Sequence, residues 1–257
     1  MKALFSVPLS LVLASLPAMA AAQTNSDVED MSDPLSVYTQ VGAGYTDKGL
    51  NLKMGQTFDT GKDTTMGMHV LELKGALGDS LGFRNYATDS IDSVRLRRFG
   101  VDLTNGRGSQ IDFNYSFAAE TGSLSYSFIQ ALPAMGRLQL YPLAGVGAAF
   151  ANNAMGDDGT PVSGYSVPGT FAVVGSYSKF TISDKVWLNY NPMYMQTLSG
   201  SDNYKNHAYL GHDSMLAHEF AASYQINPRL NVRYFAQWNQ RVSFKDGTHI
   251  IEFNYQL

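Results

Sequence analysis

The stretch that decides the fold is the last eleven residues of the chain, Gly247 to Leu257 (GTHIIEFNYQL). Apolar or aromatic side chains stand at every second position, and mostly polar side chains stand between them. The first row is Ile251, Phe253, Tyr255 and Leu257, and the second is Ile250, Glu252, Asn254 and Gln256. A period of two predicts a β-strand with one dry face and one wet face.

The N-terminus has the features of a secretory signal peptide. Lys2 supplies a positive charge, residues 3–16 form an apolar core, and small residues from Ala18 to Ala22 offer a cleavage site. The apolar core is shorter than the roughly 20 residues that a membrane-spanning helix needs. We therefore expect residues 1–22 to be removed on export. Residues 23–34 are polar, acidic and aperiodic, and we predict a flexible periplasmic segment there.

Composition excludes several classes of protein. The net charge is −4 and there is no basic block, so nothing favours nucleic-acid binding. The absence of Cys excludes disulfides, thiolate metal sites and a Cys nucleophile. Beyond residue 22 the chain has no run of about 18 apolar residues, yet it is rich in aromatics, with 15 Tyr, 14 Phe and 2 Trp. A membrane barrel gives this combination, because each strand is apolar on one face and aromatics gather at the interfaces.

From Leu35 onward the chain is a series of alternating segments separated by turn residues. The clearest pair of alternating segments is 99–104 and 111–117, which an Asn-Gly turn signal at 105–106 joins into a predicted hairpin. We count about twelve strands, or ten if 64–77 or 165–182 is a loop. The strands are placed near 36–46, 49–58, 64–77, 91–104, 109–119, 122–132, 137–151, 165–182, 185–198, 213–226, 229–243 and 247–257.

The C-terminal strand carries a resemblance to a known family. A strand that ends on the last residue, with Tyr255 third from the end, resembles the closing strand of Gram-negative outer-membrane β-barrels, although that family usually ends in Phe. The resemblance implies an all-β, transmembrane, antiparallel up-and-down β-barrel over residues 35–257, of a small porin-like type, in the cell outer membrane. It implies contact with outer-membrane lipids and lipopolysaccharide, and assembly by periplasmic chaperones and the barrel-assembly machinery. The assembly signal would be Ile251, Phe253, Tyr255 and Leu257.

The lengths of the links between strands agree with a barrel whose termini lie in the periplasm. The expected periplasmic links are short, whereas three expected outer links, 79–90, 152–164 and 199–212, are long and rich in Gly, Ser, Asn and Asp. A closed barrel is the one kind of sheet that can span lipid, because all its backbone groups are paired. A soluble β-sandwich would have no reason for such an apolar and aromatic outer face.

Charged residues in phase with the polar rows are expected to face the lumen. The predicted lumen-lining residues are Lys53, Arg98, Asp102, Asp112, Glu219, Arg233, Arg241 and Glu252. One interpretation is a charged constriction that orients a permeant solute. The other is a structural ion network that fills a narrow barrel, because buried charges need partners.

Arg95 and Arg97 share the phase of Phe99 and Val101, so the pattern predicts that they face outward. Arginine at mid-membrane would cost roughly 2–4 kcal/mol, so both would have to lie at headgroup height. A guanidinium binds phosphate in a forked geometry. The hypothesis is a lipopolysaccharide contact at Arg95 and Arg97; the alternative is a strand that extends beyond the membrane with solvated Arg.

Candidate catalytic groups are few. Five His residues are scattered, and no HExxH, GxSxG or metal-ligand cluster is present, so no catalytic residue, metal or cofactor is expected. The leading expectation is a narrow porin-like channel for passive diffusion of small polar solutes. The alternative is a non-conducting structural or surface-interaction barrel that meets lipopolysaccharide, phage or host. A third possibility, an outer-membrane lipid hydrolase, would rest on His212, Asp213 and Ser214 at an outer loop edge.

Overall fold

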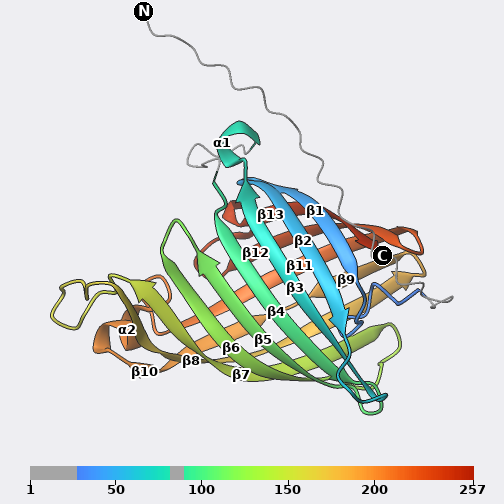
Figure 1. The fold of residues 1–257 in the computed structure, drawn as a ribbon, viewed down its shortest axis with the longest axis horizontal. Coiled ribbons are helices and arrows are strands. Elements are labelled where there is room, and N and C mark those ends of the chain that lie inside the picture. The colour runs from blue at the N-terminus through green and yellow to red at the C-terminus, as the bar shows by residue number, and fades with distance from the viewer. Residues whose placement is uncertain (1–27, 82–89) are drawn as a thin grey trace, which may run out of the picture.

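The structure, a computed structural model, describes residues 28–81 and 90–257. These residues form one antiparallel sheet that curls into a closed barrel (Figure 1). The strands are β1 Gln40–Thr46, β2 Gly49–Phe58, β3 Thr65–Ala76, β4 Ser93–Asp102, β5 Arg107–Ser116, β6 Thr121–Gln130, β7 Leu138–Asn152, β8 Tyr165–Ser183, β9 Val186–Tyr190, β10 Met193–Gly200, β11 Ser214–Asn227, β12 Leu230–Asn239 and β13 Thr248–Gln256. The helices are α1 Gly78–Leu81, α2 Asp202–His207 and the 3-10 turn η1 Phe244–Asp246.

Closure of the barrel depends on β1 and β13. β1 pairs with β2 on one side and with β13 on the other, with Gln40 opposite Gln256. β9 and β10 both lie between β8 and β11, so together they occupy one position in the wall. The thirteen segments therefore make a twelve-stranded barrel, as predicted. Both ambiguous stretches, 64–77 and 165–182, contain strands, β3 and β8, which removes the ten-stranded alternative.

The two ends of the barrel differ as the link lengths predicted. Short turns join β2 to β3, β4 to β5, β8 to β9 and β11 to β12 at one end, the end where β1 begins and β13 stops. The longer links, with α1 and α2, lie at the other end (Figure 1). The signal peptide predicted at 1–22 and part of the outer link 79–90 fall outside the described residues. In the described ranges, no helix has the length and apolar character needed to cross a membrane.

The outer wall is apolar on the strands whose alternation is clear. On β13, Phe253 is 50% exposed on the outer face, whereas its neighbour Asn254 is 2% exposed on the inner face. On β6, Phe128 is 66% exposed and Ser127 is buried. The outward row Ile251, Phe253, Tyr255 and Leu257 is therefore confirmed, while its role as an assembly signal stays a prediction.

One position in the wall is irregular. β9 and β10 are separated by Asn191 and Pro192, and proline has no N–H to give to the ladder. Side chains supply the missing bonds to β8: Asn191 Oδ1 accepts from the Ser178 N–H at 3.1 Å, and Asn189 Nδ2 donates to the Ser178 carbonyl at 2.7 Å. We call this point the seam.

Candidate functional site: the lumen of the barrel

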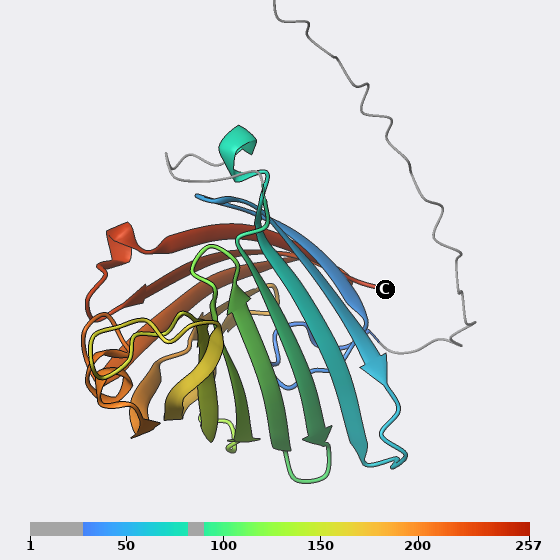
Figure 2. The ribbon, with the colours of Figure 1, turned by 60° about the vertical axis from the view of Figure 1, so that its left-hand side comes forward.

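Residues 31–38, just before β1, line a cavity inside the barrel; together with the flanking residues 28–30 and 39 we call them the lumen segment (Figure 2). The sequence predicts a flexible periplasmic segment over residues 23–34, but the structure places residues 31–34 in the lumen instead. Leu35 packs against two apolar clusters of the inner wall, one around Val101 and the other around Ile129. Val37 is a buried member of the first cluster.

Polar contacts attach the lumen segment to the half of the wall near the end where β1 begins and β13 stops, the end predicted to face the periplasm. Lys179 Nζ lies 2.8 Å from Asp30 Oδ2, and the Tyr141 hydroxyl donates to Asp33 Oδ1 at 2.9 Å. Met31 is 5% exposed, and its sulfur accepts hydrogen bonds from two side chains near the start of β12 and the end of β11. Segment and wall are thus joined at several points around the periplasmic mouth.

Asp30 gives this attachment a pH dependence. Burial works to raise the pKa of Asp30, but hydrogen bonds from Lys179 and Ser32 outweigh it, so the pKa lies below its ordinary value. A carboxyl with a lowered folded-state pKa stabilises above its unfolded pKa, and the contribution is lost as pH falls through the folded value. The Asp30 contact should therefore be complete at neutral pH and lost only below about pH 3.9.

The substitution Asp30→Asn imitates that protonation at pH 7. Because Asp30 is largely exposed, the contact contributes less than about 1 kcal/mol. We expect about a twofold faster reaction of a water-soluble maleimide with a cysteine placed at Val37, since the chain has no other thiol. A reaction rate identical with and without the substitution at residue 30 would contradict the attachment.

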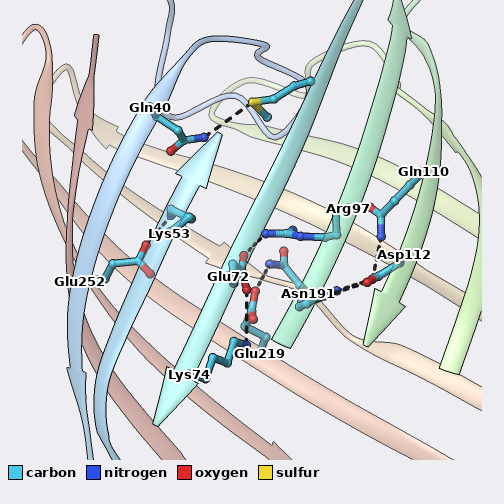
Figure 3. A network of polar contacts seen from close by, with 12 residues as sticks. Gln40, Lys53, Glu72, Lys74, Arg97, Gln110, Asp112, Asn191, Glu219 and Glu252 are labelled. Carbon is cyan, nitrogen blue, oxygen red and sulfur yellow. Dashed lines mark hydrogen bonds and ion pairs between the residues drawn. The ribbon is translucent and has the colours of Figure 1, made fainter. Parts of the chain in front are cut away.

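Above the lumen segment, one side of the inner wall carries a charged arc, defined as Lys53, Glu72, Lys74, Arg95, Arg97, Asp112 and Glu252 (Figure 3). Lys53 pairs with Glu252 across β1, where the intervening residues are Gly42 and Gly44. Because neither glycine has a side chain, the two charges can meet over that strand.

The rest of the arc is held between neighbouring strands. Glu72 on β3 pairs with Arg97 on β4 and with Lys74, at 3.5 Å, on its own strand. Arg95 on β4 donates two hydrogen bonds to the carboxylate of Asp112 on β5, with Nε at 2.9 Å from Oδ1. Gln110 adds a 3.0 Å hydrogen bond to the same carboxylate. The arc is therefore a set of ion pairs in which each carboxylate is bonded by at least one cation.

The face predicted for β4 is wrong. Arg95 and Arg97 point into the lumen and bind Asp112 and Glu72, so they are not placed for lipopolysaccharide. Arg98 lies on the outer face, 4.8 Å over the ring of Phe58, and does not line the lumen. Asp102 does not line it either: its side chain caps the periplasmic turn, accepting from the Thr104 N–H at 2.9 Å. The reason is that Phe99 and Val101 face inward here, toward the lumen segment.

Of the other predicted lumen residues, all but Arg241 face the lumen as expected. Lys53, Asp112 and Glu252 belong to the charged arc, and Glu219 and Arg233 face inward on β11 and β12. Arg241 lies beyond the end of β12, at the outer rim, where Nη1 donates to the Ser214 carbonyl at 2.9 Å. Glu72, Lys74, Asn189 and Asn191 were missed. For Glu72 and Lys74 a signal existed, because they alternate with Leu71 and Leu73 within the stretch of ambiguous phase.

Glu72 is the carboxylate with two cationic partners, so its loss should be costly. Replacing it by Ala leaves Arg97 and Lys74 unpaired in the lumen, where removal of one partner of a buried pair costs about 3 kcal/mol. We expect the urea midpoint of the folded barrel to fall accordingly. Arg98→Ala, on the outer face of the adjacent strand, is the control, with an expected loss of about 1 kcal/mol. Equal losses for the two variants would contradict the ion-pair assignment.

Glu219 and Arg233 are held differently, by neutral groups. Asn191 Nδ2 and Gln237 Nε2 donate to the two Glu219 oxygens at 2.8 and 2.7 Å. Arg233 donates from Nε to Ser223 Oγ at 3.0 Å and from Nη2 to Asn189 Oδ1 at 2.8 Å. The asparagines of the seam thus bond Ser178 on one side and a lumen charge on the other.

Between the lumen segment and the charged arc lies a cavity of about 170 Å³. Its polar lining includes Lys53, Arg97, Asn191 and Arg233, and its apolar lining comes from residues such as Val70 and Phe99. These residues come from strands all around the barrel, so the cavity occupies the lumen itself.

His218, Asp213 and Ser214 make contacts within the wall and at its rim. His218 lies on the outer wall, bonded to the Tyr190 hydroxyl at 2.8 Å and stacked on Trp238. Asp213 and Ser214 stay at the outer rim, and Gln196 and Ser214 donate hydrogen bonds to Asp213. In residues 28–81 and 90–257, no three His, Asp or Glu side chains gather closely enough to hold a metal ion.

A closed twelve-stranded barrel with an apolar outer wall and a charged lumen has the fold of outer-membrane β-barrels of the porin type. The chain is similar to the NanC porin, at 10% identity and TM-score 0.53, over 85% of this chain and 100% of that one. It is also similar to the COG4313 outer membrane channel from Pseudomonas putida F1, at 6% identity and TM-score 0.52, over 91% and 100%. No family model and no curated protein matches the chain. At these identities the likeness establishes the fold.

Proposed function

We propose that this protein is a narrow channel through which small polar solutes diffuse passively across the outer membrane. The observation that carries the proposal is the lumen cavity, lined by charged and amide side chains and bounded by the charged arc. A lumen built only to be filled would need no uncommitted polar groups. Arg97 Nε and Asn254 Oδ1 are buried without a hydrogen-bond partner among the described residues, and such groups are normally satisfied by water or a ligand.

The lumen segment sets the width of this channel. It crosses the periplasmic half of the lumen, where Leu35 and Val37 meet the apolar inner wall. Solutes would have to pass between this segment and the charged arc, so the proposal is restricted to small solutes. The driving force is the solute gradient, and no cofactor enters.

A second candidate is a non-conducting barrel that acts through its outer loops. It is favoured because the lumen segment fills part of the lumen. Those loops are ordered by their own contacts: the Asn203 N–H on α2 donates to Asp157 Oδ1 at 2.8 Å, which joins the β7–β8 link to the β10–β11 link. A preformed outer surface of this kind suits contact with lipopolysaccharide, phage or host.

Single-channel recording in planar bilayers separates the two. The purified barrel, shown to be folded by its heat-modifiable gel mobility, should give unitary current steps if it is a channel. Folded and inserted protein that gives no steps would reject the channel and leave the surface-interaction barrel. A matched preparation of the same protein unfolded before insertion is the control for leak.

A further inference from the structure

The charges of the lumen fall into two groups. In the charged arc every cation lies within ion-pair distance of a carboxylate. Within the described part of the chain, Arg233 has no carboxylate and Glu219 has no cation at that distance, and both are held by hydroxyl and amide groups. Glu252 stands opposite Arg233 in the β12–β13 register, but its carboxylate is paired with Lys53. Glu219 and Arg233 are therefore the lumen charges without an ion-pair partner of their own in the described part of the chain, and they are free to pair with a solute.

The two charges are held by two neighbouring asparagines of the seam. Asn189, which bonds Arg233, and Asn191, which bonds Glu219, stand two residues apart on the same face, a spacing of about 7 Å in extended chain. Each asparagine side chain is also hydrogen-bonded to the backbone of Ser178 on β8. Arg233, Asn189 and Asn191 line the cavity, and Glu219 accepts a hydrogen bond from the lining residue Asn191.

From this arrangement we infer that the lumen contains a binding subsite for small zwitterions of amino-acid size. The carboxylate of the solute meets the guanidinium of Arg233, and its ammonium group meets the carboxylate of Glu219. The charged atoms of an α-amino acid are about 3 Å apart, and with a charge-assisted hydrogen bond of about 2.8 Å at each end the solute reaches across about 8 to 9 Å, a length comparable with the spacing of the two asparagines that hold the charges. The inference rests on the proposed channel function and names its solute class.

Donor capacity supports the assignment at Arg233. A guanidinium has five N–H donors, and the contacts with Ser223 and Asn189 use two of them. The side chain also stacks on Phe235, with the guanidinium carbon 4.6 Å from the ring centroid, which fixes its plane. Donors therefore remain for a carboxylate without breaking the existing contacts.

The test compares two solutes of similar size, zwitterionic glycine and neutral glycolamide. Uptake of each radiolabelled solute into proteoliposomes holding the full-length barrel is measured at concentrations far below saturation. One charge-assisted hydrogen bond is enough to give glycine about a tenfold advantage. Arg233→Gln and Glu219→Gln should each reduce the glycine-to-glycolamide ratio to about one. The double variant Arg95→Gln with Asp112→Asn, which removes an ion pair of the charged arc, should leave the ratio high.

The outcomes are distinguishable. If glycolamide enters but glycine has no advantage, or if both single variants keep the advantage, the zwitterion subsite is wrong and the channel stands. If neither solute enters through folded barrel, the proposed channel and the subsite both fail. Heat-modifiable mobility of each variant shows that the barrel is folded before its uptake is compared.

Discussion

Deleting residues 28–37 is expected to raise the single-channel conductance of the barrel several-fold. The strands begin at Gln40, so the deletion removes all but the last two residues of the lumen segment without shortening β1. It empties the periplasmic half of the lumen, where Leu35 and Val37 now pack on the inner wall. Planar-bilayer recordings of the native and shortened proteins measure the effect.

A second variant separates release of the segment from its removal. Leu35→Asp with Val37→Asp keeps the chain length but forfeits about 2 kcal/mol of apolar burial at each site and adds the cost of burying a carboxylate. Ordering each residue costs about 1–2 kcal/mol, so a segment that loses two apolar contacts should leave the wall. Its conductance should approach that of the deletion. Removal of residues 23–27 alone is the matched control, and a rise in conductance equal to that of the longer deletion would contradict the role of the lumen segment.

Removing Tyr255 to Leu257 should abolish assembly of the barrel. Tyr255 is paired with Val41 on one side and with Leu230 on the other, so this residue takes part in closure. The Gln256 N–H donates to the Arg229 carbonyl and the Leu257 N–H to the Thr39 carbonyl, at 2.8 and 3.0 Å. Without these residues the start of β1 has unpaired backbone groups, each costing several kcal/mol in lipid. Folded protein in the outer-membrane fraction should become undetectable by heat-modifiable mobility.

A paired variant tells backbone closure from recognition of the side chains. Tyr255→Ser with Leu257→Ser keeps every backbone pair but removes two members of the outward row Ile251, Phe253, Tyr255 and Leu257. If that row is the signal for the assembly machinery, this variant should fail as the truncation does. If closure alone matters, it should assemble. Normal insertion of the truncated chain would overturn both explanations.

The barrel itself could be predicted from the sequence because period-two alternation is a local property. The last strand, the strand number and the difference between short and long links all follow from it. The face of β4 could not. Phe99 and Val101 look like lipid-facing residues, but they pack in the lumen beside Leu35 and Val37. A rule that places polar residues inside holds where the lumen contains water, and it fails at the height where an apolar segment fills it.

The charged residues show the same limit. Lys53, Asp112, Glu219, Arg233 and Glu252 were expected in the lumen because their own strands had a clear phase, and the structure places them there. Arg98 was placed on the wrong face together with its whole strand. The asparagines of the seam gave no signal, because an amide reads as an ordinary polar residue until its partners on other strands are known. A residue whose role depends on partners from distant segments can be identified only after the fold is known.

The path of the lumen segment has a consequence for the timing of its movements. The segment begins beside Lys179 near the end of β8 and leads into β1 at Gln40, so it begins and ends at the same mouth of the barrel. The segment therefore enters the lumen from one mouth and does not run through its whole length. It can leave and return without separating any two strands and without passing a chain end through the lumen. Such loop motions are complete in nanoseconds to microseconds once the contacts break. Under the proposed channel function, the lumen would therefore open and close without any change in the strand pairing of the wall.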